Sequence, residues 1–321
     1  MRINLIIGAG QLGSRHLQGM LKWKGEQKVY VLDPFEESLK VASSRAAEVE
    51  HDHEVLFVTD IKDVPRQLNL VIVATQSNIR EKIVENLLNS CSVEFLILEK
   101  VLFQEVDAYH RVNRLIQGIP TWVNHPRRMF SFYQELKQKP IMQIPNKIFS
   151  VQGTNWGLGC NGLHFIDLFM FLTTSKLKSL NTFWVDQQII ESKRNGYIEF
   201  TGSLLGELDN GDKFIITSQK GHPSGTTICV SYEDKQFVTL EGGQNINLFF
   251  PDENPKVELN LFAIKYQSSL TEQLCADIFE TGTTNLPSYD EACQPHILFI
   301  EAFLEHFNKI QNTQTKILAI T

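Results

Sequence analysis

The sequence has few cysteines, and none of them lies in a closely spaced pair. The five in 321 residues are Cys91, Cys160, Cys229, Cys275 and Cys293. An odd number at such wide spacing argues against a disulfide framework. The absence of a CxxC motif argues against a structural zinc site, so we predict no metal centre. Free thiols fit a reducing compartment, and we expect a cytoplasmic protein.

Long apolar runs and an excess of positive charge are also missing. The opening run, residues 3–7, is too short for a signal-peptide core, and no stretch approaches the ~18 apolar residues of a membrane span. The net charge is -7, which provides no basic surface of the kind that nucleic-acid binding requires. We therefore expect neither nucleic-acid nor membrane partners. The length of the chain favours two domains.

Short apolar runs alternate with segments of helical length over the first 120 residues. Strands are predicted at residues 3–7, 29–32, 55–58, 70–74, 95–98 and 121–123. Strands that are apolar on both faces and alternate with helices indicate a parallel sheet covered on both sides. We predict an α/β Rossmann domain, a doubly wound parallel sheet, over residues 1–122.

The pattern changes after residue 148. Runs of β-branched and aromatic residues are separated by turn signals, which is typical of antiparallel strands. Helices are predicted at residues 162–172 and 289–307. Residues 123–321 are therefore predicted to form an α+β domain for substrate binding and oligomerisation, with a mostly antiparallel sheet. The last helix and tail are free to pack back on the first domain.

A GxGxxG motif follows the first predicted strand and opens a helix: Gly8, Ala9, Gly10, Gln11, Leu12 and Gly13. The first glycine permits a tight turn, the second lets the backbone approach a pyrophosphate, and the third lets helix and strand pack closely. The N–H groups that begin the helix favour the phosphate charge. We predict dinucleotide binding by this loop.

Asp33 ends the second predicted strand, twenty residues after Gly13. A carboxylate at this point binds the ribose hydroxyls of a dinucleotide and repels a 2′-phosphate, so the sequence predicts NAD rather than NADP. An alternative places Asp33 and Pro34 in a turn that caps the next helix. That role is compatible with ribose binding.

Distinctive segments follow several later strands: residues 74–78 (Ala-Thr-Gln-Ser-Asn), Glu99-Lys100, residues 124–128, and His164-Phe165-Ile166-Asp167 after a glycine-rich turn. With the Rossmann half, these resemble the glucose–fructose oxidoreductase / inositol dehydrogenase (Gfo/Idh/MocA) family over nearly the whole chain. The resemblance implies that Thr75, Ser77, Glu99 and Lys100 lie at the cofactor. It also implies that His16 is a packing residue on the first helix.

In that family the Lys of a Glu-Lys-Pro motif contacts sugar and nicotinamide, and a His on the first helix of the second domain is an acid or base. Lys100 and His164 match these positions, and proton exchange with a sugar hydroxyl suits a Lys at the end of a strand. Asp167 lies three residues after His164, on the same helix face, where it is expected to orient the imidazole or bind a sugar hydroxyl. The alternative is that His164 is a structural residue satisfied by its neighbours.

Two positions depart from the family pattern. Val101 follows Lys100 where the family has Pro, and Cys160 stands four residues before His164, where many members have Asp. A thiol does not orient an imidazolium as a carboxylate does. Three alternatives follow: Asp167 substitutes, Lys100 works alone, or the activity is weakened.

The substrate-binding candidates are Asn124, Arg127, Arg128, Trp156 and Cys160. Arginines suit a carboxylate or phosphate, and an indole suits a sugar or nicotinamide ring. The alternatives are a solvated loop at residues 124–128 and a core position for Trp156. His296, on an apolar helix face, is predicted to be a core histidine.

The leading hypothesis is an NAD(H)-dependent enzyme that moves hydride to or from a hydroxyl-bearing carbon of a sugar or nucleotide sugar. Residues 33–34 and 124–128 resemble members that work in surface-polysaccharide or nucleotide-sugar biosynthesis. The alternatives are a non-catalytic NAD-binding sensor and a redox-neutral epimerase or lyase that passes through a transient ketone. We also expect a homodimer or homotetramer formed through the second-domain sheet, whose strands carry Phe183, Trp184, Phe200, Phe214 and Phe237.

Overall fold

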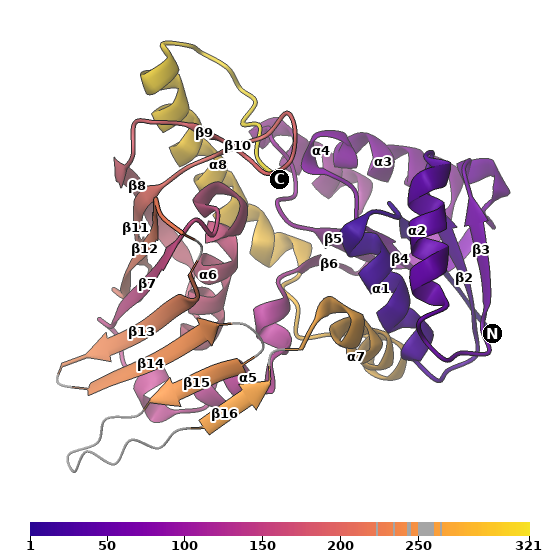
Figure 1. Ribbon diagram of the computed structural model, residues 1–321, viewed down its shortest axis with the longest axis horizontal. Coiled ribbons are helices and arrows are strands. Elements are labelled where there is room, and N and C mark those ends of the chain that lie inside the picture. Colours follow the sequence, from indigo (N-terminus) through magenta and orange to yellow (C-terminus); the bar gives the residue numbers. More distant parts are fainter. Residues whose placement is uncertain (223, 234, 243–244, 250–259, 264) are drawn as a thin grey trace. The chain divides into compact units, whose positions relative to one another are not determined.

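The chain forms two compact units (Figure 1). The computed structural model describes residues 1–222, 224–233, 235–242, 245–249, 260–263 and 265–321. Unit 1 comprises Met1–Phe103, Asp107–Pro126 and Lys265–Glu291, and unit 2 comprises Gln104–Val106, Arg127–Ile264 and Ala292–Thr321. The sequence analysis predicted a boundary at residue 122, with all later residues in the second domain. The structure instead places the Lys265–Glu291 segment in unit 1.

Unit 1 is built on a six-stranded sheet with the order β3-β2-β1-β4-β5-β6. Its strands are β1 Arg2–Ile7, β2 Gln27–Leu32, β3 Glu54–Val58, β4 Gln67–Val73, β5 Ser92–Glu99 and β6 Thr121–Asn124. Every neighbouring pair is parallel. The strand order reverses between β1 and β4, which is where doubly wound sheets bind their ligands. The predicted Rossmann architecture is confirmed.

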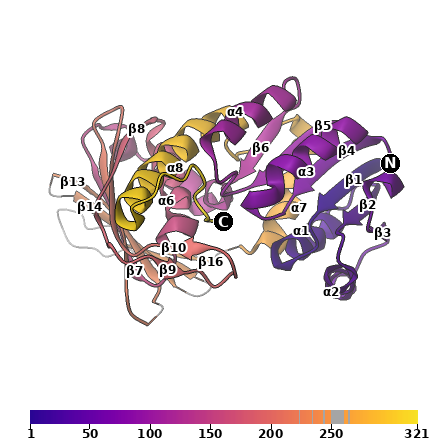
Figure 2. The same cartoon turned by 90° about the horizontal axis from the view of Figure 1, so that it is seen from above.

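Helices cover both faces of this sheet. They are α1 Gln11–Lys22, α2 Glu36–Ala46, α3 Ser77–Ser90, α4 Val106–Leu115 and α7 Gln267–Thr281. Figure 2 shows α3 and α4 on one side of the sheet and α1, α2 and α7 on the other. Helix α7 joins unit 1 because Gly19 lets it approach α1 closely: a Cβ on Gly19 would lie 2.6 Å from Cβ of Thr271.

Unit 2 contains an eight-stranded sheet with the order β16-β15-β14-β13-β7-β12-β11-β8. The strands are β7 Ile148–Thr154, β8 Leu177–Val185, β11 Gly202–Leu208, β12 Lys213–Gln219, β13 Thr226–Tyr232, β14 Lys235–Gly242, β15 Asn245–Phe249 and β16 Asn260–Ala263. Strands β7 and β12 pair in parallel, and the other pairs are antiparallel. A separate hairpin joins β9 Ile190–Glu191 to β10 Ile198–Glu199. The predicted, mostly antiparallel sheet is confirmed.

Aromatic packing holds the helices of unit 2 against its sheet. Helices α5 Ser131–Lys137, α6 Leu158–Thr173 and α8 Tyr289–Gln311 belong wholly or mainly to this unit. The Phe169 ring of α6 lies 4.1 Å from the Phe149 ring and 5.8 Å from the Phe214 ring. Phe200 packs against Phe303 of α8 at 4.7 Å.

The aromatic residues expected on an exposed sheet face therefore divide into two groups. Phe200 and Phe214 are buried in the core, whereas Phe183 and Trp184 on the edge strand β8 are 82% and 55% exposed. The side chain of Phe237 lies outside the described residues. Among the described helices, none combines the length and the apolar character needed to cross a bilayer.

A fully buried ion pair ties the start of β7 to the start of β12. Lys147 Nζ lies 3.0 Å from Asp212 Oδ2, and both side chains are 0% exposed. Asp212 Oδ1 also accepts the Lys147 backbone N–H at 2.7 Å. Each charge depends on the other, because an isolated buried charge is far more costly than a paired one.

Replacing Asp212→Asn should lower the free energy of unfolding by about 3–5 kcal/mol, because Lys147 would be left as an uncompensated buried charge. Urea unfolding followed by circular dichroism measures this change. Asp209→Asn is the matched control, since Asp209 is exposed and its amide analogue still accepts the Lys176 N–H. If Asp212→Asn and the control had equal free energies of unfolding, the stabilising role of the Lys147–Asp212 ion pair would be contradicted.

Candidate cofactor and active site

The three glycines of the loop between β1 and α1 have different surroundings. Gly8 has φ +97° and lies against Ala74, and a Cβ on Gly13 would lie 1.7 Å from the carbonyl oxygen of Gly8. A Cβ on Gly10, in contrast, would meet no heavy atom within 4 Å. Gly8 and Gly13 are therefore required by the turn and its packing. Gly10 leaves open space in front of the backbone at the start of α1.

The first turn of α1 has unpaired donors and a nearby cation. Gly10 caps the helix without a side-chain hydrogen bond, and no acidic residue lies in the first turn. Arg45 of α2 donates to the carbonyl oxygen of Gln11 at 3.0 Å and also to its side chain. Gln11 and Leu12 thus begin a helix whose N–H groups and neighbouring guanidinium favour an anion.

Asp33 supports the same loop from the end of β2. Its Oδ2 accepts the N–H of Ala9 at 2.8 Å, and its Oδ1 accepts the N–H of Phe35 at 3.0 Å. The second bond forms the predicted turn at Asp33-Pro34, but Asp33 does not cap α2, whose N-cap is Phe35. Each carboxylate oxygen retains a further lone pair, so ribose binding by Asp33 stays a compatible prediction.

A buried arginine that the sequence analysis missed connects two loops at the carboxyl edge of the sheet. Arg80 of α3 is 1% exposed and donates to the carbonyl oxygens of Thr75, Val101 and Leu102. The first of these loops carries Thr75 and Ser77, and the second carries Lys100. The Lys100–Val101 peptide bond is cis. Arg80 therefore holds the backbone of the two loops that carry these candidate cofactor residues.

Glu99 lies at the centre of a buried polar network in unit 1. Its Oε1 accepts hydrogen bonds from His16 Nε2 at 2.8 Å and from Asn124 Nδ2 at 2.6 Å. His16 Nδ1 lies 2.8 Å from Thr271 Oγ1, and Asn124 Nδ2 also donates to Gln267. His16 is thus a packing residue, as predicted. The network joins α1, β5, β6 and α7.

Charge and hydrogen bonds keep Glu99 ionised in spite of its burial. Burial on its own raises the pKa of the Glu99 carboxyl, but the hydrogen bond and charge of His16, the Asn124 hydrogen bond and the charge of Arg80 lower the pKa more. The net pKa lies below the ordinary value. Asn124 is 2% exposed, so the solvated-loop alternative is wrong for this residue.

Two polar atoms near the same edge have no partner among the described residues. They are Thr75 Oγ1 and Asn124 Oδ1, and both atoms are buried. Buried polar groups in native proteins are nearly always paired, so an unpaired one indicates a missing partner. These atoms, together with the space at Gly10, fit a bound polar ligand at the carboxyl ends of β4 and β6.

In unit 2, the predicted arginines are held in ion pairs. Arg128 forms a bidentate pair with Asp167 at 2.9 and 2.7 Å, and Arg127 forms one with Glu241 at 3.1 and 2.6 Å. Arg127 also lies 4.2 Å above the Phe165 ring. Neither side chain belongs to a solvated loop, so that alternative is wrong here too. Asp167 shares helix α6 with His164, and both its oxygens accept from Arg128.

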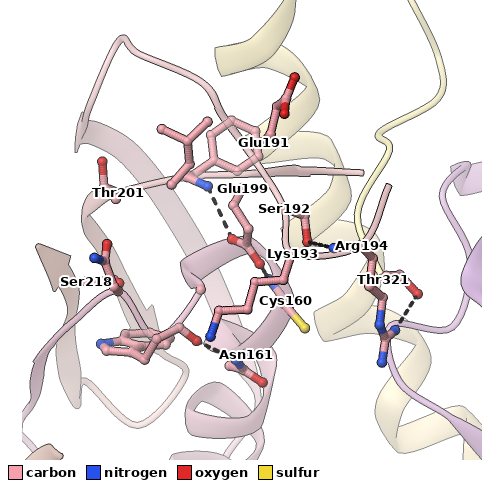
Figure 3. A pocket seen from close by; sticks show the side chains of 15 residues that line it. Cys160, Asn161, Glu191, Ser192, Lys193, Arg194, Glu199, Thr201, Ser218 and Thr321 are labelled. Carbon is pink, nitrogen blue, oxygen red and sulfur yellow. Dashed lines mark hydrogen bonds between the residues drawn. The ribbon is translucent and has the colours of Figure 1, made fainter. Parts of the chain in front are cut away.

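Trp156 and Cys160 line one pocket in unit 2, of about 410 Å³ (Figure 3). Glu199, which the sequence analysis missed, accepts the N–H groups of Gly159 and Cys160 at 2.8 and 2.9 Å. This carboxylate caps α6, which is why the helix starts at Leu158 rather than at the predicted residue 162. Lys100 belongs to unit 1, and His164, Asp167, Trp156 and Cys160 belong to unit 2.

Solved structures share this architecture over nearly the whole chain, although no protein-family profile and no curated protein matches the sequence. An oxidoreductase from Agrobacterium radiobacter, in complex with NAD+, L-tartaric acid and magnesium, is 16% identical with a TM-score of 0.68, covering 96% of this chain and 97% of that one. UDP-N-acetylglucosamine 3-dehydrogenase GnnA from Acidithiobacillus ferrooxidans is 11% identical with a TM-score of 0.67, covering 94% and 96%. The chain has the Gfo/Idh/MocA fold.

The Gfo/Idh/MocA fold also occurs in a regulator of transcription. Gal80p from Kluyveromyces lactis is 14% identical with a TM-score of 0.71, covering 96% of this chain and 93% of that one. The resemblance seen in the sequence is confirmed at the level of the fold. Because this fold carries both dehydrogenases and a regulator, the function has to be argued from the site.

The charge of Glu99 predicts a specific acid sensitivity. Because its folded-state pKa is lowered, the stability that Glu99 contributes is present above the unfolded pKa of ~4.3 and is lost as the pH falls towards the folded value. Glu99→Gln should lower the free energy of unfolding by about 1–3 kcal/mol at pH 7, because the buried donors lose a charged acceptor.

Urea unfolding at a series of pH values below 7 measures how the difference between wild type and Glu99→Gln changes. The difference should shrink towards low pH. Glu94→Gln, on the same strand but exposed, is the control and should change the stability little at pH 7. If the difference in free energy of unfolding between wild type and Glu99→Gln stayed constant down to pH 3, the stabilising role of the ionised Glu99 would be contradicted.

Proposed function

We propose that this protein is an NAD(H)-dependent oxidoreductase that transfers hydride to or from a hydroxyl-bearing carbon of a sugar or nucleotide sugar. The observation that carries the proposal is the loop between β1 and α1, where Gly8 and Gly13 are required by packing and Gly10 faces open space. That division of roles is the one that a bound pyrophosphate requires. The fold, shared with an oxidoreductase bound to NAD+, supports the same cofactor class.

The residues present fit NAD. The α1 N–H groups and Arg45 would hold the pyrophosphate, and Thr75 Oγ1 and Asn124 Oδ1 provide unpaired polar atoms at the strand ends. Asp33 would accept the ribose hydroxyls, and its negative charge disfavours the 2′-phosphate of NADP. The bound nicotinamide supplies the acceptor or donor of hydride.

We assign the proton transfer mainly to Lys100, with His164 assisting. Lys100 directly follows the carboxyl end of β5, where ligands of doubly wound sheets bind. The neighbours of Lys100 in sequence are held on both sides. Glu99 is bonded to His16, and the carbonyl groups of Val101 and Leu102 accept hydrogen bonds from Arg80. A lysine held in this way can exchange a proton with a substrate hydroxyl as its carbon loses or gains hydride.

A non-catalytic NAD-binding regulator is the second candidate. Cys160 replaces the family's aspartate, and Asp167, the other carboxylate near His164 in sequence, is in a bidentate pair with Arg128. The fold shared with Gal80p favours the same possibility. This candidate binds NAD without turnover.

We further propose a homodimer or homotetramer formed through the sheet of unit 2. Phe183 and Trp184, consecutive and exposed residues of the edge strand β8, support an apolar contact there. Large apolar side chains exposed on a sheet edge are candidates for an interaction surface.

Gly10→Ala tests the cofactor site. The new Cβ meets nothing in the folded protein, and Gly10 has φ -64°, so the midpoint of unfolding should not change. The Cβ would occupy the space proposed for the pyrophosphate, so NAD+ affinity measured by calorimetry should fall at least about tenfold. Gly13→Ala is the contrasting variant, which should unfold. NAD+ affinity equal to wild type in folded Gly10→Ala would reject the site.

Lys100→Met tests the enzyme assignment. Purified protein is mixed with NAD+ or NADH and a panel of sugars, nucleotide sugars and their keto forms, and nicotinamide absorbance and products are followed. The variant should retain NAD+ affinity and lose turnover by about 10²–10⁴-fold, because the proton acceptor is removed. Wild-type turnover in the variant would exclude the role of Lys100.

The same assay separates the alternatives. An altered sugar without net NADH would identify a redox-neutral epimerase or lyase. Tight NAD+ binding without turnover on any member of the panel would favour the regulator.

A further inference from the structure

The pocket of about 410 Å³ in unit 2 lies at the beginning of α6, beside the β9–β10 hairpin. Its volume falls within the range of small-molecule sites, about 300–1,000 Å³. Figure 3 shows polar side chains from α6, the hairpin and β12 surrounding it, Asn161, Lys193 and Ser218 among them. The site described above does not account for these three residues.

Ser218 has an unsatisfied hydroxyl in the wall of this pocket. The side chain is 0% exposed, and its Oγ has no hydrogen-bond partner among the described residues. A buried hydroxyl is costly without a partner, and native proteins rarely leave one unpaired. Ser218 therefore requires a hydrogen-bonding group that comes from within the pocket.

The lining of the pocket contains two cations, Lys193 and Arg194, and two carboxylates, Glu191 and Glu199. Lys193 forms neither an ion pair nor a hydrogen bond with the described part of the chain, and in Figure 3 its side chain extends into the pocket towards Asn161. Glu199 uses both carboxylate oxygens to accept N–H groups at the start of α6, and Arg194 donates to the Thr321 hydroxyl at 3.4 Å. The carboxylate of Glu191 points away from Lys193 in Figure 3.

Trp156 forms a rigid apolar side of the pocket. Its Nε1 donates to the carbonyl oxygen of Thr217 at 3.0 Å, and its ring meets that of Phe165 edge-on at 5.2 Å. Gly153 lies against the indole, since a Cβ there would be 2.8 Å from Trp156 Cδ1. A fixed aromatic ring suits the apolar face of a second ring.

We propose that this pocket binds a hydroxylated ring compound that carries one negative charge, a carboxylate or a phosphate. Ser218 bonds a ring hydroxyl, Lys193 pairs with the anionic group, and Trp156 contacts the face of the ring. The inference rests on the proposed function, because Trp156 and Cys160 are among the substrate-binding residues that the sequence predicts for that oxidoreductase. It narrows the substrate to the chemistry of a sugar acid or a sugar phosphate.

Calorimetry with the full chain, with and without NAD+, tests the proposal. The probes are D-glucuronate, D-glucose 6-phosphate, D-glucose and inorganic phosphate. At least one charged sugar should bind about tenfold or more tightly than D-glucose and than inorganic phosphate, because it alone satisfies Lys193, Ser218 and Trp156 together. The preferred probe distinguishes a carboxylate ligand from a phosphate ligand.

Two substitutions separate ligand binding from folding. Ser218→Ala should lower the affinity for the bound probe about fivefold, because one hydrogen bond to the probe is lost. The midpoint of unfolding should stay the same or rise, because an unpaired buried hydroxyl is removed. Lys193→Met should weaken the charged probes at least about fivefold and leave D-glucose unaffected. Lys176→Met, an exposed lysine outside the pocket, is the matched control and should bind all probes as wild type does.

Equal binding of charged and uncharged sugars, or wild-type affinity in both pocket variants, would overturn the proposal. NAD+ binding measured in the same samples distinguishes failure of the pocket proposal from failure of the proposed oxidoreductase function. NAD+ binding with no affinity for either charged sugar would overturn this inference and leave the oxidoreductase in place. A bound charged sugar without NAD+ binding would instead reject the proposed function.

Discussion

The candidate cofactor site of unit 1 depends on one buried carboxylate, Glu99. A charge removed from water requires partners, and here they come from three other elements: His16 on α1, Asn124 on β6 and, beyond these, Thr271 and Gln267 on α7. The network connects the helix of the glycine-rich loop to the strand end that carries Lys100. It also explains why Lys265–Glu291 packs with the first unit.

Around that network, polar side chains divide into those that support loops and those that remain available. Asp33 and Arg80 hold the backbone of the loops after β1, β4 and β5 through hydrogen bonds to N–H and carbonyl groups. Thr75 Oγ1 and Asn124 Oδ1 remain unpaired within the described residues. The loops are therefore set by the protein itself, which is the preorganisation that orientation of a cofactor requires.

Unit 2 uses the same physical device at its pocket. Glu199 caps α6 and so positions Cys160 and Trp156, while the ion pair of Arg128 with Asp167 joins the segment after β6 to the middle of that helix. Lys193, which has no partner among the described residues, remains available to an anionic ligand in this pocket. A shared fold with dehydrogenases and with Gal80p does not decide between catalysis and regulation, because function belongs to such local arrangements.

The sequence alone determined the alternation of strands and helices in the Rossmann half, the mostly antiparallel character of the second sheet and the glycine-rich loop, because these follow from local periodicity and from backbone freedom at Gly8 and Gly13. Only the tertiary structure decided what the polar side chains contact. Asn124 and Arg128 were predicted as substrate contacts, yet their partners Glu99 and Asp167 lie 25 and 39 residues away in sequence. The sequence predicted that α6 begins at residue 162, whereas it begins at Leu158. The residue that caps it, Glu199, lies 40 residues after Gly159. Pairings over such separations arise from packing, and no local pattern in a single sequence encodes them.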